Sequence, residues 1–190
     1  MVQTSTRYIT QAAFEQLCHE HPERLMERTA QGELVNVSPV GGEGSNQEAT
    51  LIIKVGIWNE RTQLGQVFSS QGAFRLPFGS TRAPDVAWLS QDRWDALTPE
   101  QRIGFPPICP DFVIELRSYS LSGGQLKPQS LAELRTKMTE YVASGLRLGW
   151  LINPPDQQVE IYRQGQAVQV VAMPTVLSGE AVLPEFELSV

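Results

Sequence analysis

The chain has 190 residues, 41% of them hydrophobic and 19% charged, which is typical of one globular domain. Its net charge of −6 argues against a protein that coats duplex DNA non-specifically, because such a protein presents a basic face; it does not exclude a nuclease whose carboxylates bind metal. The sequence has no apolar run near the roughly 20 residues of a membrane helix and no secretion signal, so we expect a cytoplasmic protein.

The N-terminal part of the chain predicts two helices with a hairpin between them. Thr10 is the expected N-cap of the first helix, and "RLMERTAQGELVNVSP" predicts a hairpin that turns at "TAQG". The segment "VSPVGGEGSN" lacks the phosphate-binding pattern GxxxxGK[ST]. We therefore expect it to be a turn that leads into a helix over residues 46–61.

The rest of the chain predicts strands with two further helices. Strands are expected at "QVFSS", "AFRLP", "PDVAWLS", "DFVIELRS" and "LRLGWLINP", and a helix begins at "LTPEQR". The polar segment "SYSLSGGQLKPQS" is expected to be a loop, after which Ser130 and Glu133 form a capping box that opens a helix to about Ser144. "QQVEIYRQGQAVQVV" predicts a hairpin, and the tail "AVLPEFELSV" predicts an edge strand.

This order predicts one mixed α/β domain over residues 1–190, with hairpins at its periphery. We expect three parts: an N-terminal helix and hairpin (1–42), a core (43–153), and a C-terminal hairpin with an edge strand (154–190).

Two charges stand at the end of an otherwise apolar strand. Because strand side chains alternate between faces, Glu115 and Arg117 of "CPDFVIELRS" share one face. A buried charge is costly unless it is paired or bound to metal. The charges therefore form either an ion pair at the strand end or part of a functional site.

A lysine lies close to the apolar side of the next helix. Leu134, Met138 and Tyr141 form the apolar stripe, and Lys137 lies on or beside it. Its ammonium can point into a site next to the covered strand, or it can form a surface pair with Glu133.

These residues suit metal-assisted hydrolysis of phosphodiesters. Asp85 begins the strand "PDVAWLS", and together with Glu115 and the backbone carbonyl of Leu116 it offers the hard oxygen ligands that Mg²⁺ prefers. The metal acidifies a bound water, and a nearby cation positions that water or stabilises charge on the phosphate.

Pro84-Asp85 followed by Glu115-Leu116-Arg117 resembles the PD-(D/E)xK nuclease signature. Nearly the whole chain is similar to the Uma2 family of restriction-endonuclease-like proteins, most specifically in "RAPDVAW", "PDFVIELRS", "KMTEY", "SGLRLGWLINP" and "VEIYR". The resemblance implies a restriction-endonuclease-like core, with a mixed central sheet flanked by helices, in residues 43–153.

The resemblance also implies roles for individual residues. Asp85 and Glu115 would be the metal ligands, Lys137 the catalytic lysine displaced from strand to helix, and Glu48 an additional acidic group from the first core helix. Arg117 occupies the usual lysine position; it can contact a phosphate or pair with Glu115, but it cannot act as a base.

A second departure from the family pattern lies in "SYSLSGG". Relatives often carry an acidic residue there, where this chain has Leu121-Ser122.

The first functional hypothesis is a nuclease that uses Mg²⁺ or Mn²⁺ to cut DNA, with RNA left open as a substrate and a homodimer as its compatible assembly. The alternative is a weakened nuclease fold that binds nucleic acid or a protein without cutting it. A third hypothesis is a scaffold whose charges form internal ion pairs only.

Overall fold

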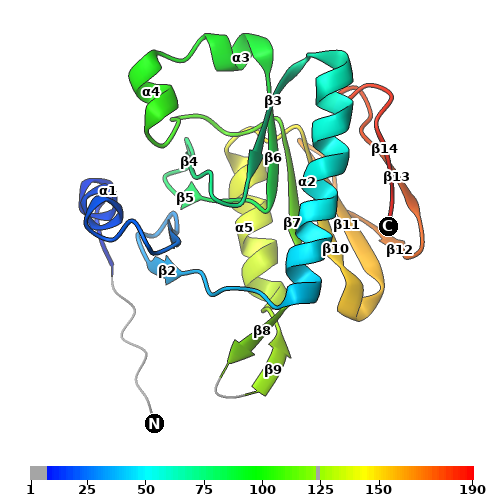
Figure 1. Cartoon of the computed structure of the whole chain (residues 1–190), viewed down its shortest axis with the longest axis horizontal. Coiled ribbons are helices and arrows are strands. Elements are labelled where there is room, and N and C mark those ends of the chain that lie inside the picture. Colours follow the sequence, from blue (N-terminus) through cyan, green and yellow to red (C-terminus); the bar gives the residue numbers. More distant parts are fainter. Residues whose placement is uncertain (1–7, 123–124) are drawn as a thin grey trace.

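The structure is a computed structural model, which describes residues 8–122 and 125–190 (Figure 1). Its centre is a six-stranded sheet. In spatial order, the strands are β12 (Gln169–Ala172), β11 (Gln158–Arg163), β10 (Leu148–Asn153), β7 (Phe112–Leu116), β6 (Val86–Ser90) and β3 (Gly65–Ser69). Strands β7 and β10 run parallel, and the other neighbours are antiparallel. This mixed central sheet confirms the predicted fold class.

Two long helices cover opposite faces of the central sheet. They are α2 (Gly42–Thr62) and α5 (Leu131–Ala143). In β7, Ile114 packs in the cluster that contains Val55 of α2, whereas Val113 packs in the cluster that contains Met138 of α5. Since alternate strand residues point to opposite faces, Glu115 lies on the α5 face.

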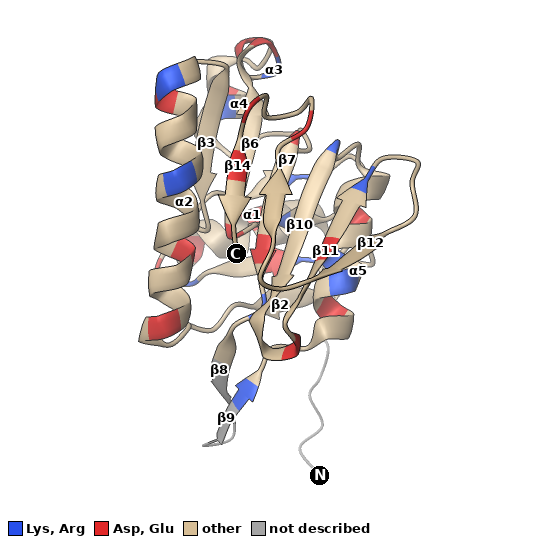
Figure 2. Ribbon diagram, turned by 90° about the vertical axis from the view of Figure 1, so that its right-hand side faces the viewer, with Lys and Arg blue, Asp and Glu red and all other residues tan. Residues whose placement is uncertain are grey.

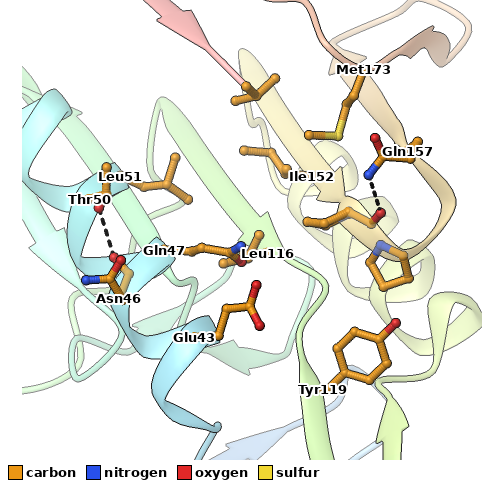
Figure 3. A pocket seen from close by; sticks show the side chains of 13 residues that line it. Glu43, Asn46, Gln47, Thr50, Leu51, Leu116, Tyr119, Ile152, Gln157 and Met173 are labelled. Atoms are coloured by element: carbon orange, nitrogen blue, oxygen red, sulfur yellow. Dashed lines mark hydrogen bonds between the residues drawn. The ribbon is translucent and has the colours of Figure 1, made fainter.

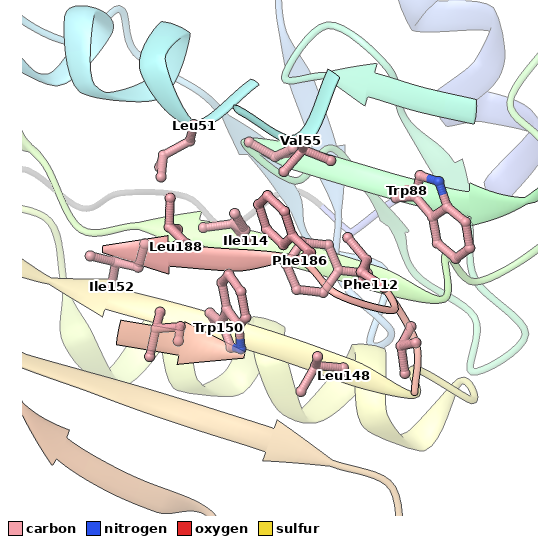
Figure 4. Close-up of a cluster of buried hydrophobic side chains, with 14 of the residues drawn as sticks. Leu51, Val55, Trp88, Phe112, Ile114, Leu148, Trp150, Ile152, Phe186 and Leu188 are labelled. Atoms are coloured by element: carbon pink, nitrogen blue, oxygen red, sulfur yellow. The ribbon is translucent and has the colours of Figure 1, made fainter. Parts of the chain in front are cut away.

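The larger hydrophobic cluster lies between the central sheet, α2 and the C-terminal segment (Figure 4). At its centre is the fully buried Trp150, which packs edge-on against Phe112 with ring centroids 4.8 Å apart and stacks on Phe186 at 6.1 Å. Burial of side chains of this size stabilises the fold by roughly 1.5–3 kcal/mol each.

A second, four-stranded sheet joins the N-terminal hairpin to the segment that precedes β6. In spatial order it contains β2 (Leu34–Asn36), β1 (Met26–Arg28), β5 (Thr81–Arg82) and β4 (Phe74–Arg75). The antiparallel pairing of β1 with β2 confirms the predicted hairpin. Because β1 also pairs with β5 through Arg28 and Thr81, the hairpin lies beside the chain that enters Asp85.

Helix starts agree with their sequence signals where a side chain provides the cap. The hydroxyl oxygens of Thr10, Thr98 and Ser130 each accept a backbone N–H at the starts of three helices. These helices are α1 (Gln11–Glu20), α4 (Pro99–Ile103) and α5. Helix α2 begins earlier than predicted, because its cap is Gly41, which provides no side-chain hydrogen bond to mark it.

The short helix α3 (Gln91–Asp95) and the 3₁₀ turn η1 (Pro154–Asp156) are additional to the predicted elements. The predicted hairpin of β11 with β12 is confirmed by their antiparallel pairing.

Two predictions for the peripheral segments are wrong. The expected loop after β7 is a hairpin of β8 (Tyr119–Ser122) with β9 (Gln125–Pro128); Gly123 and Gly124 lie outside the described residues. The tail strand β14 (Glu187–Ser189) pairs with β13 (Val176–Ser178) in a separate two-stranded sheet, not at the edge of the central one. The reason is that Leu177 and Leu188 are buried in the larger cluster, so this sheet covers a face.

Over the described ranges, with residues 1–7 and 123–124 set aside, no helix is long and apolar enough to cross a membrane.

Candidate active site

Asp85 and the end of β7 are joined where the pairing of β6 with β7 stops. Val86 is the first residue of β6 and pairs with Ile114. The preceding Pro84 has no N–H with which to extend the ladder. Instead, Oδ2 of Asp85 accepts the backbone N–H of Leu116 at 2.7 Å. The carboxylate is thereby fixed against the strand that carries Glu115.

Glu115 is buried and bound by two side chains of α5. Its side chain is 2% exposed, and the Lys137 ammonium lies 2.8 Å from Oε1 and 3.0 Å from Oε2. The hydroxyl of Tyr141 donates to Oε1 at 3.1 Å. Lys137 therefore faces the site and pairs with Glu115. Arg117 pairs elsewhere.

The Lys137 ammonium has acceptors on three sides. Besides Glu115, it donates to the carbonyl of Ala83 at 2.9 Å and lies 2.8 Å from Oε1 of Glu27. Its side chain is only 12% exposed. An ammonium has three N–H donors, so these acceptors match its full capacity.

Glu27 of β1 and Arg82 of β5 extend the cluster into the second sheet. Arg82 contacts Oε2 of Glu27 at 2.9 Å and Oε2 of Glu140 at 2.6 Å, and each side chain is at most 6% exposed. Oε1 of Glu27 also accepts the Ala83 N–H at 3.0 Å.

Sequence reasoning missed Glu27, Arg82 and Glu140. Glu27 is 55 residues from Arg82, and Arg82 is 58 from Glu140, so local periodicity gave no signal for either contact. The one usable hint was that Arg82 stands three positions before Asp85 in "RAPD".

Two acidic groups of the site, Asp85 and Glu115, have pKa values above their ordinary range. Burial raises the pKa of Asp85 to about 6, although the Lys137 ammonium and the Leu116 N–H act in the opposite direction. Burial also raises the pKa of Glu115, and the nearby Asp85 adds to this effect, while Lys137 opposes it.

The partners of these groups stay charged. Burial disfavours the Lys137 ammonium, but Glu115, Glu27 and Asp85 outweigh it, so the pKa of Lys137 is above its ordinary value. Burial works against the Glu27 carboxylate as well, yet Lys137 and Arg82 together lower its pKa.

The charges in this cluster do not balance when every group is ionised. Four carboxylates, those of Glu27, Asp85, Glu115 and Glu140, surround two cations, Lys137 and Arg82. The surplus of two negative charges equals the charge of one divalent cation, and it adds to the effect of burial on the pKa values of Asp85 and Glu115.

The donor atoms also fit a magnesium-type ion. Among the hydrogen bonds of the described residues, Oδ1 of Asp85 receives none. In an extended strand the N–H and C=O of one residue point to the same side, so we expect the Leu116 carbonyl to point toward Asp85. In the described part of the chain, no three His, Cys, Asp or Glu side chains converge to hold a metal by themselves. Mg²⁺ suits such a set, because it is usually held by one or two carboxylates and retains several waters.

The structure places the remaining predicted residues apart from this centre. Glu48, on α2, raises the pKa of Asp85 by its charge and accepts the hydroxyl of Ser70 at 2.6 Å. Arg117 binds Asp156 at 2.8 Å and the carbonyl of Gln129 at 2.9 Å. It therefore braces the end of β7 against η1 and the segment before α5.

The side chains of residues 120–126 lie outside the described set. The expectation that Leu121-Ser122 departs from the family pattern in a way that affects the site therefore stays a prediction.

A pocket of about 560 Å³ opens on the other side of β7, between α2 and η1 (Figure 3). The Leu116 side chain lines it, together with the carboxylate of Glu43 and the amides of Asn46 and Gln47. Since Leu116 and Glu115 point to opposite faces, this pocket is separate from the charged cluster.

Comparisons with known proteins agree with the predicted family. The family model of Uma2, described as "Putative restriction endonuclease", matches residues 11–190. A crystal structure from Anabaena variabilis ATCC 29413, described as a putative nuclease belonging to DUF820, is similar with a TM-score of 0.70 and 20% identity, and the match covers 88% of each chain. At that identity, the likeness shows the fold. No protein of curated function matches the chain.

Proposed function

The chain belongs to the Uma2 family, and from that premise we propose that it is a metal-dependent nuclease that hydrolyses phosphodiester bonds of DNA. The observation that carries the proposal is the buried cluster at the end of β6 and β7. There Asp85 and Glu115 meet Lys137 in a cluster whose four carboxylates outnumber its two cations by two when every group is ionised. A cluster that served stability alone would gain from a balanced count, since uncompensated buried charge is costly.

In this proposal, Asp85, Glu115 and the carbonyl of Leu116 hold Mg²⁺ or Mn²⁺. The ion would neutralise charge on the phosphate and make a bound water acidic enough to attack it. Oδ2 of Asp85 already accepts the Leu116 N–H. Oδ1 accepts no hydrogen bond from the described residues, so it is the oxygen available to the metal.

Lys137 acts as a hydrogen-bond donor and a positive charge, not as a base. Its pKa is raised by three surrounding carboxylates, so it keeps its proton at neutral pH. It can orient the attacking water or stabilise charge that grows on the phosphate oxygens. To do either, it exchanges one of its present acceptors for the substrate.

Arg117 and Glu48 act at the border of the site. Arg117 stands two residues after Glu115, and we assign it contact with an incoming phosphate in exchange for the half-exposed Asp156. The charge of Glu48, on α2, raises the pKa of Asp85. We therefore assign Glu48 a contact with the metal through a water molecule.

One observation favours the alternative of a binding module without cleavage. Both oxygens of Glu115 are already bound, Oε1 by Lys137 and Tyr141 and Oε2 by Lys137. A carboxylate accepts about four hydrogen bonds, so one position on Oε2 is left for a metal. In a binding module, Lys137 and Glu115 would stay paired with each other and neither would contact a metal or a phosphate.

The test is cleavage of supercoiled DNA, linear DNA and RNA with Mg²⁺, Mn²⁺ or EDTA. Wild type should nick DNA only with metal, and Glu115→Gln should lose at least about 100-fold in rate, as expected for a group that stabilises the transition state. Glu160→Gln is the matched control, because Glu160 of β11 is also buried but pairs with Arg135 of α5, outside the cluster. If wild type cuts with neither metal, the nuclease proposal is wrong, and DNA binding without cleavage would then support the alternative.

A further inference from the structure

Among the described residues, Glu27 is the one acidic partner of Lys137 that comes from outside the predicted nuclease core of residues 43–153. It lies on β1, in the N-terminal hairpin, and its side chain is 4% exposed. Its Oε1 lies 2.8 Å from the Lys137 ammonium and accepts the Ala83 N–H at 3.0 Å, and its Oε2 binds Arg82. Both oxygens are therefore committed to the site.

A lysine needs such restraint if its ammonium is to act at one point. Its four-carbon stem is flexible, and burial alone does not select one rotamer. Glu115 holds the ammonium from the central sheet, and the Ala83 carbonyl holds it from the segment between β5 and β6. Glu27 holds it from the second sheet and completes a three-sided arrangement.

The same carboxylate ties α5 at a second point. Glu140 follows Lys137 by three positions, so both face the same side of the helix. Arg82 bridges Glu140 to Glu27. Consequently, Glu27 fixes α5 directly through Lys137 and indirectly through Arg82, and a shift of the helix would strain two ion pairs.

We infer that Glu27 is a positioning residue for Lys137: it holds the ammonium against Glu115 and keeps it oriented for the reaction. As a statement about catalysis, this rests on the proposed nuclease function. The placement of the ammonium itself can be tested without any turnover.

The experiment compares wild type, Glu27→Gln, Glu27→Asp and Glu160→Gln. The chain contains only three lysines, Lys54, Lys127 and Lys137, and the first two are exposed. Selective ¹⁵N-lysine labelling therefore gives three ammonium signals, two of which are internal references. We expect the Lys137 signal to be sharp and protected from exchange in wild type and in Glu160→Gln, and shifted or broadened in Glu27→Gln.

Kinetics provide the second readout. Glu27→Gln should lower kcat by about 30- to 100-fold while KM changes less than about threefold, because Glu27 orients a group that acts in the transition state and does not touch DNA. Glu160→Gln, which removes an equally buried charge, should keep kcat within about threefold of wild type. Equal losses in the two variants would mean that loss of any buried carboxylate impairs the fold, and would overturn the inference.

Glu27→Asp guards against a variant that fails to fold. It keeps the charge but withdraws the carboxylate by one methylene, so it should remain folded with an intermediate kcat and a shifted Lys137 signal. A wild-type Lys137 signal and wild-type kcat in this variant would overturn the inference. If wild type itself does not cleave, the nuclease proposal fails, and the Lys137 signal still decides placement: an unchanged signal in a folded Glu27 variant refutes it.

Discussion

Asp85 is the residue whose surroundings should leave the clearest mark on the pH dependence of stability. Its pKa rises from 3.8 to about 6 on folding, chiefly through burial. Between these pH values the folded chain holds a proton that the unfolded chain has released, so stability falls as pH rises through this window.

We therefore expect Asp85→Asn to be more stable than wild type at pH 8 in EDTA, and no different at pH 3. Two pKa units correspond to about 3 kcal/mol, but Asp85 keeps some contact with solvent, so we expect about 1–2 kcal/mol. Urea denaturation at both pH values measures the difference. Asp92→Asn, at an exposed position, is the control; lower stability of Asp85→Asn at pH 8 would contradict the electrostatic account.

At the scale of residues, the sequence predicted those side-chain orientations that follow from strand alternation and helical spacing. Glu115 on the α5 face and Lys137 on the inner side of its helix follow from periods of two and about 3.6 residues. The orientation of Arg117 toward Asp156 does not follow, since it depends on where η1 places a residue 39 positions away.

At the scale of elements, the strongest constraint on the site is the close packing of α5 on β10. Gly149 has no side chain, and a Cβ there would lie 2.6 Å from the end of Met138 and 2.7 Å from Leu146. A larger residue would force the side chains of Met138 and Leu146 to repack beneath the helix that carries Lys137.

Gly149→Val should thus destabilise the fold by about 1–3 kcal/mol, as overpacked cores do, and should weaken cleavage more than its stability loss explains.

Gly56→Ala tests the reverse case, a glycine whose replacement should stabilise the fold. Gly56 lies inside α2 with open space around its Cβ position, so alanine should stabilise by about 0.5–1 kcal/mol. Thermal melts of both variants measure these effects; a Gly149→Val protein as stable as wild type would contradict the packing argument.

Elements with a local signature could be predicted, and those defined by distant partners could not. The caps of Thr10, Thr98 and Ser130 are local, as are the turns of the two confirmed hairpins. The two-residue strand β5 exists only because β1 and β4 flank it. Likewise, β14 was assigned to a sheet edge because nothing in "AVLPEFELSV" tells that Leu188 is buried against a face.

At the scale of the whole molecule, one charged cluster joins the central sheet to the second, four-stranded sheet. The central sheet provides Glu115, the second sheet provides Glu27 and Arg82, and α5 provides the groups between them. In Figure 2, both acidic and basic positions occur along α2 and α5.

A divalent ion that neutralises the two excess negative charges of the cluster should consequently stabilise the whole fold. We expect Mn²⁺ or Mg²⁺ at about ten times its Kd to add about 1.4 kcal/mol, which raises Tm by about 3–6 °C in a chain of this size. Asp85→Asn should lose this response, whereas Glu160→Gln should keep it. Calorimetry with EDTA as the reference gives the shift; equal responses in wild type and Asp85→Asn would place the metal elsewhere.

The contact between β1 and α5 has a consequence for anyone who borrows this fold for design. A catalytic unit cut out along the predicted core boundaries, 43–153, would keep Asp85, Glu115 and Lys137 but discard the hairpin with Glu27. Arg82 would then lose one of its two carboxylates, and Lys137 one of its three anchors. The smallest transferable unit is therefore larger than residues 43–153, and grafts or chimaeras should carry the N-terminal hairpin with them.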